Sequence, residues 1–461
     1  MNSLIDLCRC DGGAVYVLRQ KPNGTQVLTF EAMVTRSKGL QSVPKKVQRM
    51  EFKVDEFTIV GKTAKTRRFV NQTFTDHIEV LDYKTRNLLS GPLLTPRGEL
   101  VGVVQLINKG AVPGKPEQTV EFDAHDESLF RSVAGHAALA IENSFLLQEQ
   151  EGLLQGFVDA FVTAVEARDP VTSGHSKRVA DLSMELAYAV NRETTGALAA
   201  IKFSDEQLRE IQYSAMLHDI GKVSVNESVL NKEKKLYAHE LDQIRLRLEL
   251  IKSQLRYADT QASSIDIRRQ LVRLEKAWTE INIANEPTVL PEDVSVALSE
   301  LGKFQLQLTE SETLPLLTED EIKRLSIKRG SLTDAERREI EKHVTFTYEI
   351  LRKIPWSRGL RDVPKIAYCH HERMDGSGYP QRLRLDEIPM QGRLMAICDI
   401  YDALTADDRP YKRALSHQRA IEIIEMDVKA QKLDQNLFRC FLDSKSYEIV
   451  RKISAKGKKA A

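Results

Sequence analysis

Five histidines stand in short motifs that also contain carboxylates, namely His175, His218, His343, His370 and His371. His218 is followed directly by an aspartate, in the run Leu-His-Asp-Ile-Gly-Lys, and His370 is followed directly by His371. Neutral imidazoles combined with carboxylates are suitable ligands for borderline divalent metals such as iron and manganese. Two such ions together lower the pKa of a shared water and hold phosphoryl oxygens during in-line attack. These residue types therefore predict a hydrolytic metal site in which Asp219 can bridge two ions.

Each motif alone also has an ordinary structural explanation. A single histidine on an apolar helix is more often a satisfied interior residue than a ligand, and His-His or His-Asp pairs arise by chance. The combination favours the metal site because the motifs are flanked by Gly or Pro turn signals. In addition, Lys222 follows Asp219 by three residues, where a cation can meet a phosphate.

Four blocks of this sequence resemble the HD-GYP phosphodiesterases, a branch of the HD-domain metallohydrolases. The two most specific are the Leu-His-Asp-Ile-Gly-Lys run and the run His-His-Glu-Arg-Met-Asp-Gly-Ser-Gly-Tyr-Pro, which starts at His370. The others extend from Asp169 to Ser176 and from Asp399 to Lys412. The resemblance covers residues from about 155 to 440, apart from one inserted region.

This resemblance implies an all-α domain that hydrolyses cyclic di-GMP to the linear dinucleotide pGpG, with GMP as a further product left open. Asp219 and Lys222 are the implied catalytic residues. The implied ligands of two iron or manganese ions are His175, His218, Asp219, His343, His370, His371 and Asp399. The implied substrate-binding residues are Lys222, Asp375, Gly378, Tyr379, Pro380, Arg409 and Lys412. For Arg409 and Lys412, a solvated helix start is the alternative explanation.

One position departs from the resembled pattern near the first metal histidine. Some members of the family carry a glutamate four residues before that histidine, where it helps to hold a third ion. Here the position is Val171, which cannot ligate a metal, so two ions are expected. Glu166 is a candidate substitute from the preceding helix, and a solvated glutamate is the alternative.

A second departure is the long stretch between Asp219 and His343, which the family usually spans with a short segment. The resembled pattern resumes at 331–336, ahead of His343, so residues 232–330 are interpreted as an insertion. The assignment of His343 as a ligand depends on that resumption, and His239 in the insertion is the competing candidate. Leu241 to Leu255 and Ile267 to Ile281 show heptad spacing around a polar break, which predicts an antiparallel helical hairpin.

The N-terminal segment has the pattern of an α+β domain. Short β-branched or aromatic runs are bounded by turn residues, and the tract from Leu93 to Ile107 predicts a β-hairpin with Pro-Arg-Gly-Glu as its turn. Residues 98–109, followed by Phe122 to Glu127, resemble a GAF domain whose first helix is shortened. A bound cyclic nucleotide is one implication, and an ion pair between Lys109 and Asp126 that ties the last strand to the last helix is the other.

These elements predict a multidomain protein, an α+β GAF sensor followed by an all-α HD-GYP domain that carries a helical-hairpin insertion. The expected ranges are 1–127 for the GAF domain, 128–156 for a connecting helix, 157–231 and 331–461 for the HD-GYP domain, and 232–330 for the insertion. The apolar spacing between 128 and 156 predicts either packing on its own domain or a homodimeric signalling coil.

Composition limits the remaining possibilities. The 461 residues carry 67 basic and 66 acidic side chains, a net charge of +1, which argues against a nucleic-acid polymer as partner. Apolar runs are too short to span a bilayer, no signal peptide is visible and the five cysteines are scattered, so a cytoplasmic protein is expected. The ligand of the GAF domain is unknown. Alternatives to the hydrolase are a catalytically weak cyclic dinucleotide receptor and an HD hydrolase of another nucleotide.

Overall fold

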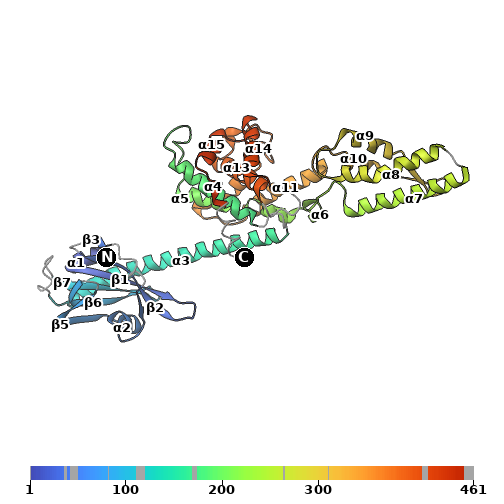
Figure 1. Ribbon diagram of the computed structural model, residues 1–461. Helices are drawn as coiled ribbons and strands as arrows, with labels where there is room; N and C mark the ends of the chain where they lie inside the picture. The colour runs from blue at the N-terminus through green and yellow to red at the C-terminus, as the bar shows by residue number, and fades with distance from the viewer. Residues whose placement is uncertain are drawn as a thin grey trace. The chain divides into compact units, whose positions relative to one another are not determined.

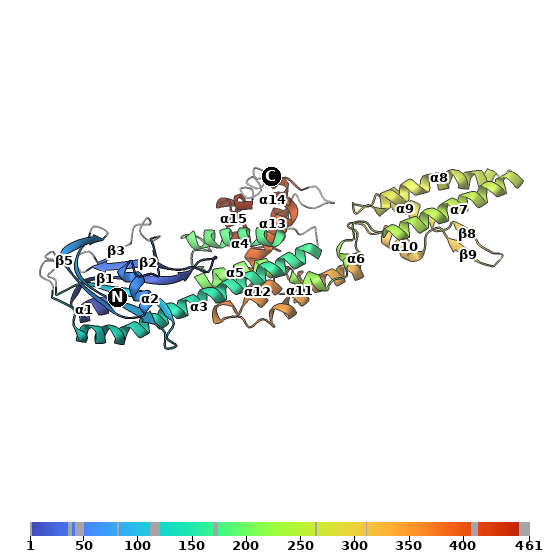
Figure 2. The ribbon, with the colours of Figure 1, turned by 90° about the horizontal axis from the view of Figure 1, so that it is seen from below.

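The computed structural model describes residues 2–35, 39–41, 50–80, 83–110, 120–168, 174–262, 265–309, 311–406 and 414–450. The chain forms two compact units, Met1–Gln155 and Gly156–Ala461, and Figures 1 and 2 show both from two directions. Among the described residues, no helix combines the length and the apolar character needed to cross a membrane.

The first unit is built on one antiparallel sheet (Figure 1). The strand order is β3-β2-β1-β7-β6-β5, and β4 pairs with β2. The strands are β1 (Cys10–Gln20), β2 (Gln26–Thr35), β3 (Gly39–Gln41), β4 (Glu51–Lys53), β5 (Val70–Val80), β6 (Tyr83–Leu94) and β7 (Leu100–Lys109). The helices are α1 (Asn2–Leu7), α2 (Ile59–Thr66) and the first part of α3 (Ala124–Arg168).

Helices cover both faces of this sheet, which explains why β7 has apolar residues at consecutive positions, interrupted by Gln105. On one face, Phe130 of α3 packs in a cluster with Val104 and Leu106. On the other, Val60 of α2 packs in a cluster with Val103. Successive side chains of a strand point to opposite faces, so a strand covered on both sides needs apolar residues at consecutive positions.

The sequence predictions for this unit hold at the β6–β7 hairpin. The two strands pair from Leu88 opposite Ile107 to Leu94 opposite Leu100, and the turn closes with hydrogen bonds between Thr95 and Gly98 and between Thr95 and Glu99. The Lys109 ammonium contacts the carboxylates of both Asp126 and Asp123. The last strand is thus tied to the start of α3, which is the structural role predicted for Lys109.

The second unit is a helical assembly around α4, α5, α11, α12 and α13. Helix α4 packs on α5 and α13, and α11 packs on α12 and on the 3₁₀ turn η2. The helices are α4 (His175–Arg192), α5 (Asp205–Leu217), α6 (Glu227–Leu230), α11 (Asp334–Leu351), α12 (Val363–Tyr368), α13 (Met390–Thr405), α14 (His417–Lys429) and α15 (Gln435–Asp443). The 3₁₀ turns are η2 (Ile220–Ser224), η3 (Arg358–Leu360) and η4 (Leu385–Glu387).

The region 232–330 folds around an apolar core of its own. The predicted heptad helices are α7 (Ala238–Ala262) and α8 (Ile265–Asn285), which pack against each other. The prediction of a hairpin alone was incomplete, because α9 (Glu292–Leu301), β8 (Gln305–Gln307), β9 (Thr313–Pro315) and α10 (Glu319–Leu325) follow it. Leu298 and Leu306 from these later elements join Leu248 and Leu274 in the same buried cluster. Two helices cannot bury their apolar seam alone, and the later elements cover it.

Candidate metal centre

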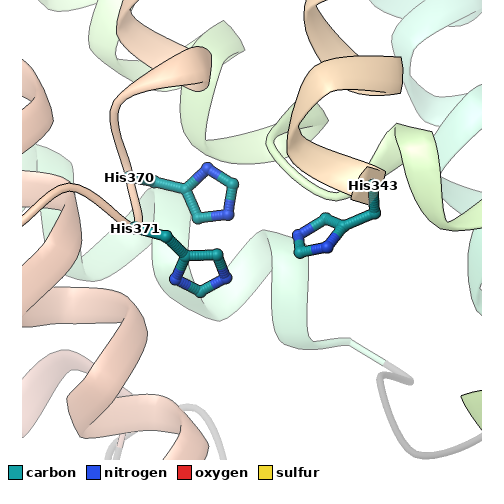
Figure 3. A group of neighbouring side chains, drawn as sticks. All are labelled: His343, His370 and His371. Carbon is teal, nitrogen blue, oxygen red and sulfur yellow. The ribbon is translucent and has the colours of Figure 1, made fainter. Parts of the chain in front are cut away.

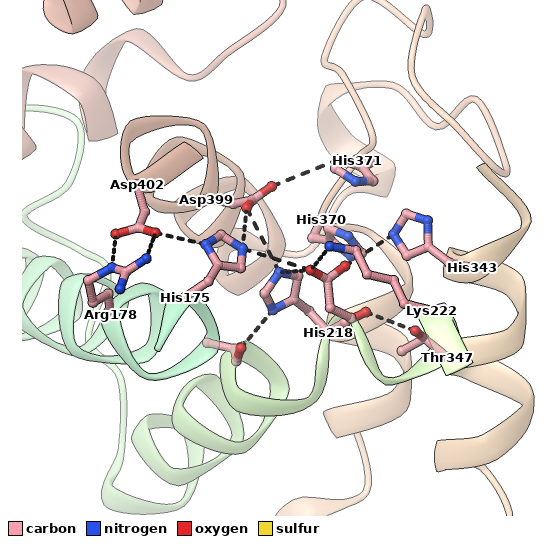
Figure 4. A network of polar contacts seen from close by, with 12 residues as sticks. His175, Arg178, His218, Lys222, His343, Thr347, His370, His371, Asp399 and Asp402 are labelled. Atoms are coloured by element: carbon pink, nitrogen blue, oxygen red, sulfur yellow. Dashed lines mark hydrogen bonds and ion pairs between the residues drawn. The ribbon is translucent and has the colours of Figure 1, made fainter. Parts of the chain in front are cut away.

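The structure brings together all seven residues predicted as metal ligands, and Figure 4 labels each of them except Asp219. They come from elements far apart in the chain. His175 begins α4, His218 and Asp219 lie between α5 and η2, His343 lies in α11, His370 and His371 follow α12, and Asp399 lies in α13. Possible ligand atoms form two groups, and within each group all of them lie within 4.8 Å of one another. One group is His343, His370 and His371 (Figure 3), and the other is His175, His218 and Asp219.

Three of the histidines are held by the backbone of their own helix. The Nδ1 atoms of His218, His343 and His370 lie 2.7, 2.6 and 2.6 Å from the carbonyl oxygen three residues earlier. A carbonyl only accepts, so Nδ1 carries the proton and Nε2 keeps its lone pair. All three Nε2 atoms are buried and have no hydrogen-bond partner among the described residues. Such orphaned acceptors fit a divalent metal ion.

The two carboxylates each face both groups of histidines. Asp219 directs Oδ2 toward His218 at 3.4 Å and Oδ1 toward His343 at 3.3 Å. Asp399 directs Oδ1 toward His175 at 3.2 Å and Oδ2 toward Nδ1 of His371 at 4.0 Å. Asp219 therefore has one oxygen toward each group, as a residue that would bridge two ions needs.

The electrostatics of the site favour the protonation states that metal ligands need. Burial lowers the pKa of His218 and of His370, and lowers the pKa of His371 to about 4, so these imidazoles are neutral. Burial alone would raise the pKa of Asp219, but the neighbouring Lys222 ammonium holds it well below its usual range. Ligands must be deprotonated to bind a metal, and these groups already are.

His175 differs from His218, His370 and His371 in its charge. Burial opposes its protonation, yet hydrogen bonds with the carboxylates of Asp399 and Asp402 raise its pKa to about 9. A cation at this position balances the buried carboxylates, which is a role that a divalent ion can take over.

A buried threonine joins the two halves of the site. Thr347 of α11 donates its hydroxyl to the His218 carbonyl at 2.8 Å and accepts from the Gly221 N–H at 3.0 Å. Gly221 has no room for a side chain, because a Cβ there would lie 1.9 Å from the His343 carbonyl oxygen. This close packing fixes the turn that carries His218 and Asp219 against the helix that carries His343.

Lys222 and Tyr379, two of the predicted substrate-binding residues, lie beside predicted metal ligands. Lys222 lies 2.8 Å from Oδ2 of Asp219, and the Tyr379 ring lies 4.8 Å from the His371 ring. Gly378 is packed so tightly that a Cβ would lie 2.3 Å from the backbone nitrogen of Arg373, and Pro380 completes the loop.

Asp375 is occupied within its own loop. Its carboxylate accepts from the N–H and the hydroxyl of Ser377 at 2.9 and 2.7 Å, and it lines a groove of about 680 Å³ together with Arg384 and Asp434. None of the ligand residues lines this groove. Asp375 therefore stays a predicted substrate-binding residue whose carboxylate is bonded within its own turn.

The remaining sequence candidates fall outside the cluster or outside the described residues. Arg409, Lys412 and Val171 are not among the described residues. Neither group of possible ligands among the described residues includes Glu166 of α3 or His239 of α7. His239 stacks on Tyr237 in the insertion, with ring centres 5.9 Å apart.

Three contributing residues were missed from the sequence, namely Asp402, Arg178 and Thr347. Asp402 follows Asp399 by three residues and Arg178 follows His175 by three, so in each case helical periodicity places the pair on one face. This three-residue spacing could have identified Asp402 and Arg178 from the sequence. Thr347 carries no such signal, because its partners are more than one hundred residues away.

Family models match three parts of the chain. A GAF domain model matches residues 1–141, an HD domain model matches residues 172–282, and a second HD domain model matches residues 318–437. The chain joins a GAF domain to an HD domain. The predicted fold class is confirmed, since the α+β GAF domain is followed by a helical HD region. HD domains are metal-dependent hydrolases, which agrees with the donor set described above.

Curated relatives match short segments of this GAF–HD chain. The Vibrio cholerae 3'3'-cGAMP-specific phosphodiesterase 3 is 38% identical over 98 residues, which is 21% of this chain and 20% of the relative. A cyclic di-GMP phosphodiesterase of the same organism is 42% identical over 102 residues, 21% of this chain and 20% of the relative. The Xanthomonas campestris cyclic di-GMP phosphodiesterase response regulator RpfG is 39% identical over 95 residues, which is 21% of this chain and 25% of the relative. The chain thus spans only about a fifth to a quarter of these relatives.

Solved structures were also matched. The GAF domain of an Acinetobacter phosphoenolpyruvate-protein phosphotransferase is 19% identical, with a TM-score of 0.24, covering 32% of this chain and 80% of that one. An HDG"Y"P protein from Bdellovibrio bacteriovorus is 10% identical, with a TM-score of 0.21, covering 82% of this chain and 99% of that one.

Proposed function

We propose that this protein is a metal-dependent phosphodiesterase that hydrolyses cyclic di-GMP to linear pGpG and is regulated by its GAF domain. The observation that carries the proposal is a cluster of three buried imidazole Nε2 atoms without hydrogen-bond partners, together with two carboxylates that each face both groups of histidines. Relatives that share about 40% identity with segments of the chain are named cyclic di-GMP phosphodiesterases, which supports this substrate class.

The proposed ligand sets follow the two groups of histidines. His175, His218 and Asp399 would hold one ion, the three histidines of Figure 3 would hold the other, and Asp219 would bridge them. When bound, iron or manganese would supply Lewis acidity toward a phosphoryl oxygen and an acidified water.

Lys222 has the position expected of a residue that steadies the scissile phosphate. Its ammonium pairs with the proposed bridging carboxylate, and the side chain is only 16% exposed. Negative charge that develops on the phosphoryl oxygens is therefore met by a fixed, partly desolvated cation. The loop Gly378-Tyr379-Pro380 borders His371 and is proposed to contact the nucleotide, as are Arg409 and Lys412 outside the described residues.

The proposal is tested with protein loaded separately with iron and with manganese, its metal content measured, and cyclic di-GMP supplied as substrate. Chromatography should show pGpG, and the same assay reports whether GMP forms. An absence of turnover in both forms, with two ions bound, would refute the proposal. An Asp219→Ala variant that keeps its signalling output in cells would instead favour the receptor alternative.

A second substrate deserves a parallel assay. Two further V. cholerae relatives, 43% and 35% identical over short segments, are also named 3'3'-cGAMP-specific phosphodiesterases. We therefore propose 3'3'-cGAMP as the alternative substrate. The ratio of kcat/KM for the two cyclic dinucleotides decides between them.

The proposed domain ranges are 1–127, 128–156, 157–231, 232–330 and 331–461. The range 128–156 lies inside the continuous helix α3, and large apolar residues on α3 are exposed at heptad spacing. Leu139, Leu146 and Leu153 follow each other by seven residues, and Phe157 continues the same stripe, at 62% exposure. Asn143 and Gln150 would occupy intervening core positions, where polar residues specify register.

We propose that this stripe forms a parallel homodimeric coil. Light scattering of the full chain should give twice the monomer mass, and Leu146→Lys with Leu153→Lys should reduce it to the monomer mass. Leu246→Lys, at a similarly exposed position of α7, serves as the control that should leave the mass unchanged.

A further inference from the structure

His175 is oriented differently from the three histidines held by helical carbonyls. It is the first residue of α4, so the residue three positions earlier is not part of that helix. Its Nδ1 atom instead lies 2.8 Å from Oδ2 of Asp402, a carboxylate on α13 that is 227 positions away in the chain. Asp402 thus supplies the acceptor that a carbonyl supplies elsewhere in the site.

Both oxygens of Asp402 are occupied by this arrangement. Arg178 donates from Nε to Oδ1 at 2.7 Å and from its terminal nitrogen to Oδ2 at 3.1 Å. The Asp402 side chain is only 1% exposed, and it belongs to neither group of possible ligands. A buried carboxylate of this kind is stable only when it is paired, and the two-point contact with arginine provides the pairing.

Helices α4 and α13 each contribute one predicted metal ligand and one residue of the ion pair between Arg178 and Asp402. On α4, His175 and Arg178 are three residues apart, and on α13, Asp399 and Asp402 are three residues apart. Residues with this spacing lie one turn apart on the same helical face. Packing α4 on α13 therefore sets His175 against Asp399 and Arg178 against Asp402 at once (Figure 4).

We propose that Asp402 is a positioning residue that holds the Nδ1–H of His175, and thereby directs Nε2 of His175 toward Asp219 and Asp399. Nε2 of His175 lies 3.2 Å from Asp399 and 3.8 Å from Asp219. The inference rests on the proposed metal-dependent function. It adds that only the ion on the His175 and His218 side depends on Asp402, because His343, His370 and His371 have no contact with it among the described residues.

The test is a manganese titration of the full chain, followed by calorimetry and by elemental analysis of the dialysed protein. Asp402→Ala is expected to weaken one of two binding events by about 10- to 100-fold, the usual effect of removing a partner of a histidine ligand. The other event should keep its affinity. Asp402→Asn, of nearly the same shape, should show the same split to a smaller extent, because its amide oxygen can still accept from Nδ1–H.

Two controls separate positioning from a general structural role. Asp434→Asn changes another buried carboxylate of the domain that lies beside an arginine, Arg393 at 3.6 Å, and it should leave both binding events unchanged. In a His175→Ala background, Asp402→Asn should cause no further loss, because its effect is carried by the missing imidazole.

The outcomes distinguish this inference from the proposed function. If wild-type protein binds two ions and Asp402→Ala binds both with wild-type affinity, the inference is wrong while the function stands. Equal weakening of both events, or an additional loss in the His175→Ala background, also overturns it. If wild-type protein binds no ion at all, the proposed function fails and the inference fails with it.

Discussion

Replacing Thr347 by valine tests whether this residue joins the two halves of the metal centre. Thr347 is fully buried, and its hydroxyl bonds both the His218 carbonyl and the Gly221 N–H. Valine has nearly the same shape and offers neither a donor nor an acceptor. The substitution therefore leaves two buried backbone groups without partners while the packing is kept.

The expected cost follows from those two groups. A buried backbone group left unsatisfied costs about 1–3 kcal/mol, and partial relaxation reduces the sum, so we expect a loss of about 2–4 kcal/mol. Thr347→Ser keeps both hydrogen bonds and removes one methyl group, which costs about 1 kcal/mol. The difference between the two variants measures the hydrogen bonds.

The assay uses urea unfolding of metal-free protein followed by tryptophan fluorescence. The chain has two tryptophans, Trp278 in α8 and Trp356, whose indole donates to the Leu351 carbonyl at the end of α11. A Trp278→Phe background leaves Trp356 as the reporter of the HD domain. If Thr347→Val unfolds at the same urea concentration as Thr347→Ser, the hydroxyl does not join the two halves, and the reasoning is refuted.

Three further predictions concern charges in and near the site. Lys222→Met should lower kcat by about 10²- to 10³-fold while the metal content stays unchanged, because a cation aimed at the phosphate is lost but no ligand is. Metal-free protein should lose stability as the pH falls from about 6.5 to about 4, since the pKa of His371 is lowered to about 4 in the folded state and the unfolded chain binds more protons in that range. Glu336→Gln should destabilise the base of the insertion by about 3 kcal/mol, because the Lys232 side chain is 1% exposed and would lose its carboxylate partner.

Each of these predictions has a direct measurement. Steady-state kinetics with elemental analysis decides the first, and a loss of metal from Lys222→Met would show that the lysine acts through the ligands instead. Urea midpoints at pH 7 and pH 5 decide the second, and His371→Asn should reduce the dependence, because one of the histidines with a lowered pKa is removed. Urea unfolding decides the third, with Glu319→Gln, an exposed glutamate near Lys323, as the control that should be neutral.

Patterns that depend on neighbouring residues were predictable from the sequence. The β6–β7 hairpin and the heptad helices α7 and α8 are local, because turn residues and helical periodicity act within a few positions. The histidine motifs also contain the hydrogen-bond acceptors that orient their imidazoles. In three histidine motifs, the carbonyl that fixes the imidazole lies three residues earlier in the same segment.

Contacts between distant segments were decided only by the tertiary structure. The apolar residues between α7 and α8 are buried by α9, β8, β9 and α10. This burial depends on tertiary contacts between segments that are distant in the chain. Asp375 stands in a specific motif and stays a predicted substrate-binding residue, but only the structure shows that its carboxylate accepts hydrogen bonds within its own turn and lines a groove. Motif membership fixes a position in the chain and leaves the direction of the side chain open.

The sequence by itself determined which residues are chemically able to bind metals, and it determined the helices and turns that carry them. Only the tertiary structure decided that His175 is held by Asp402 and that Thr347 joins His218 to α11. The physical reason is the range of the forces involved. Hydrogen bonds within a helix follow from spacing along the chain, whereas a bond across 227 positions exists only after apolar packing has set α4 against α13.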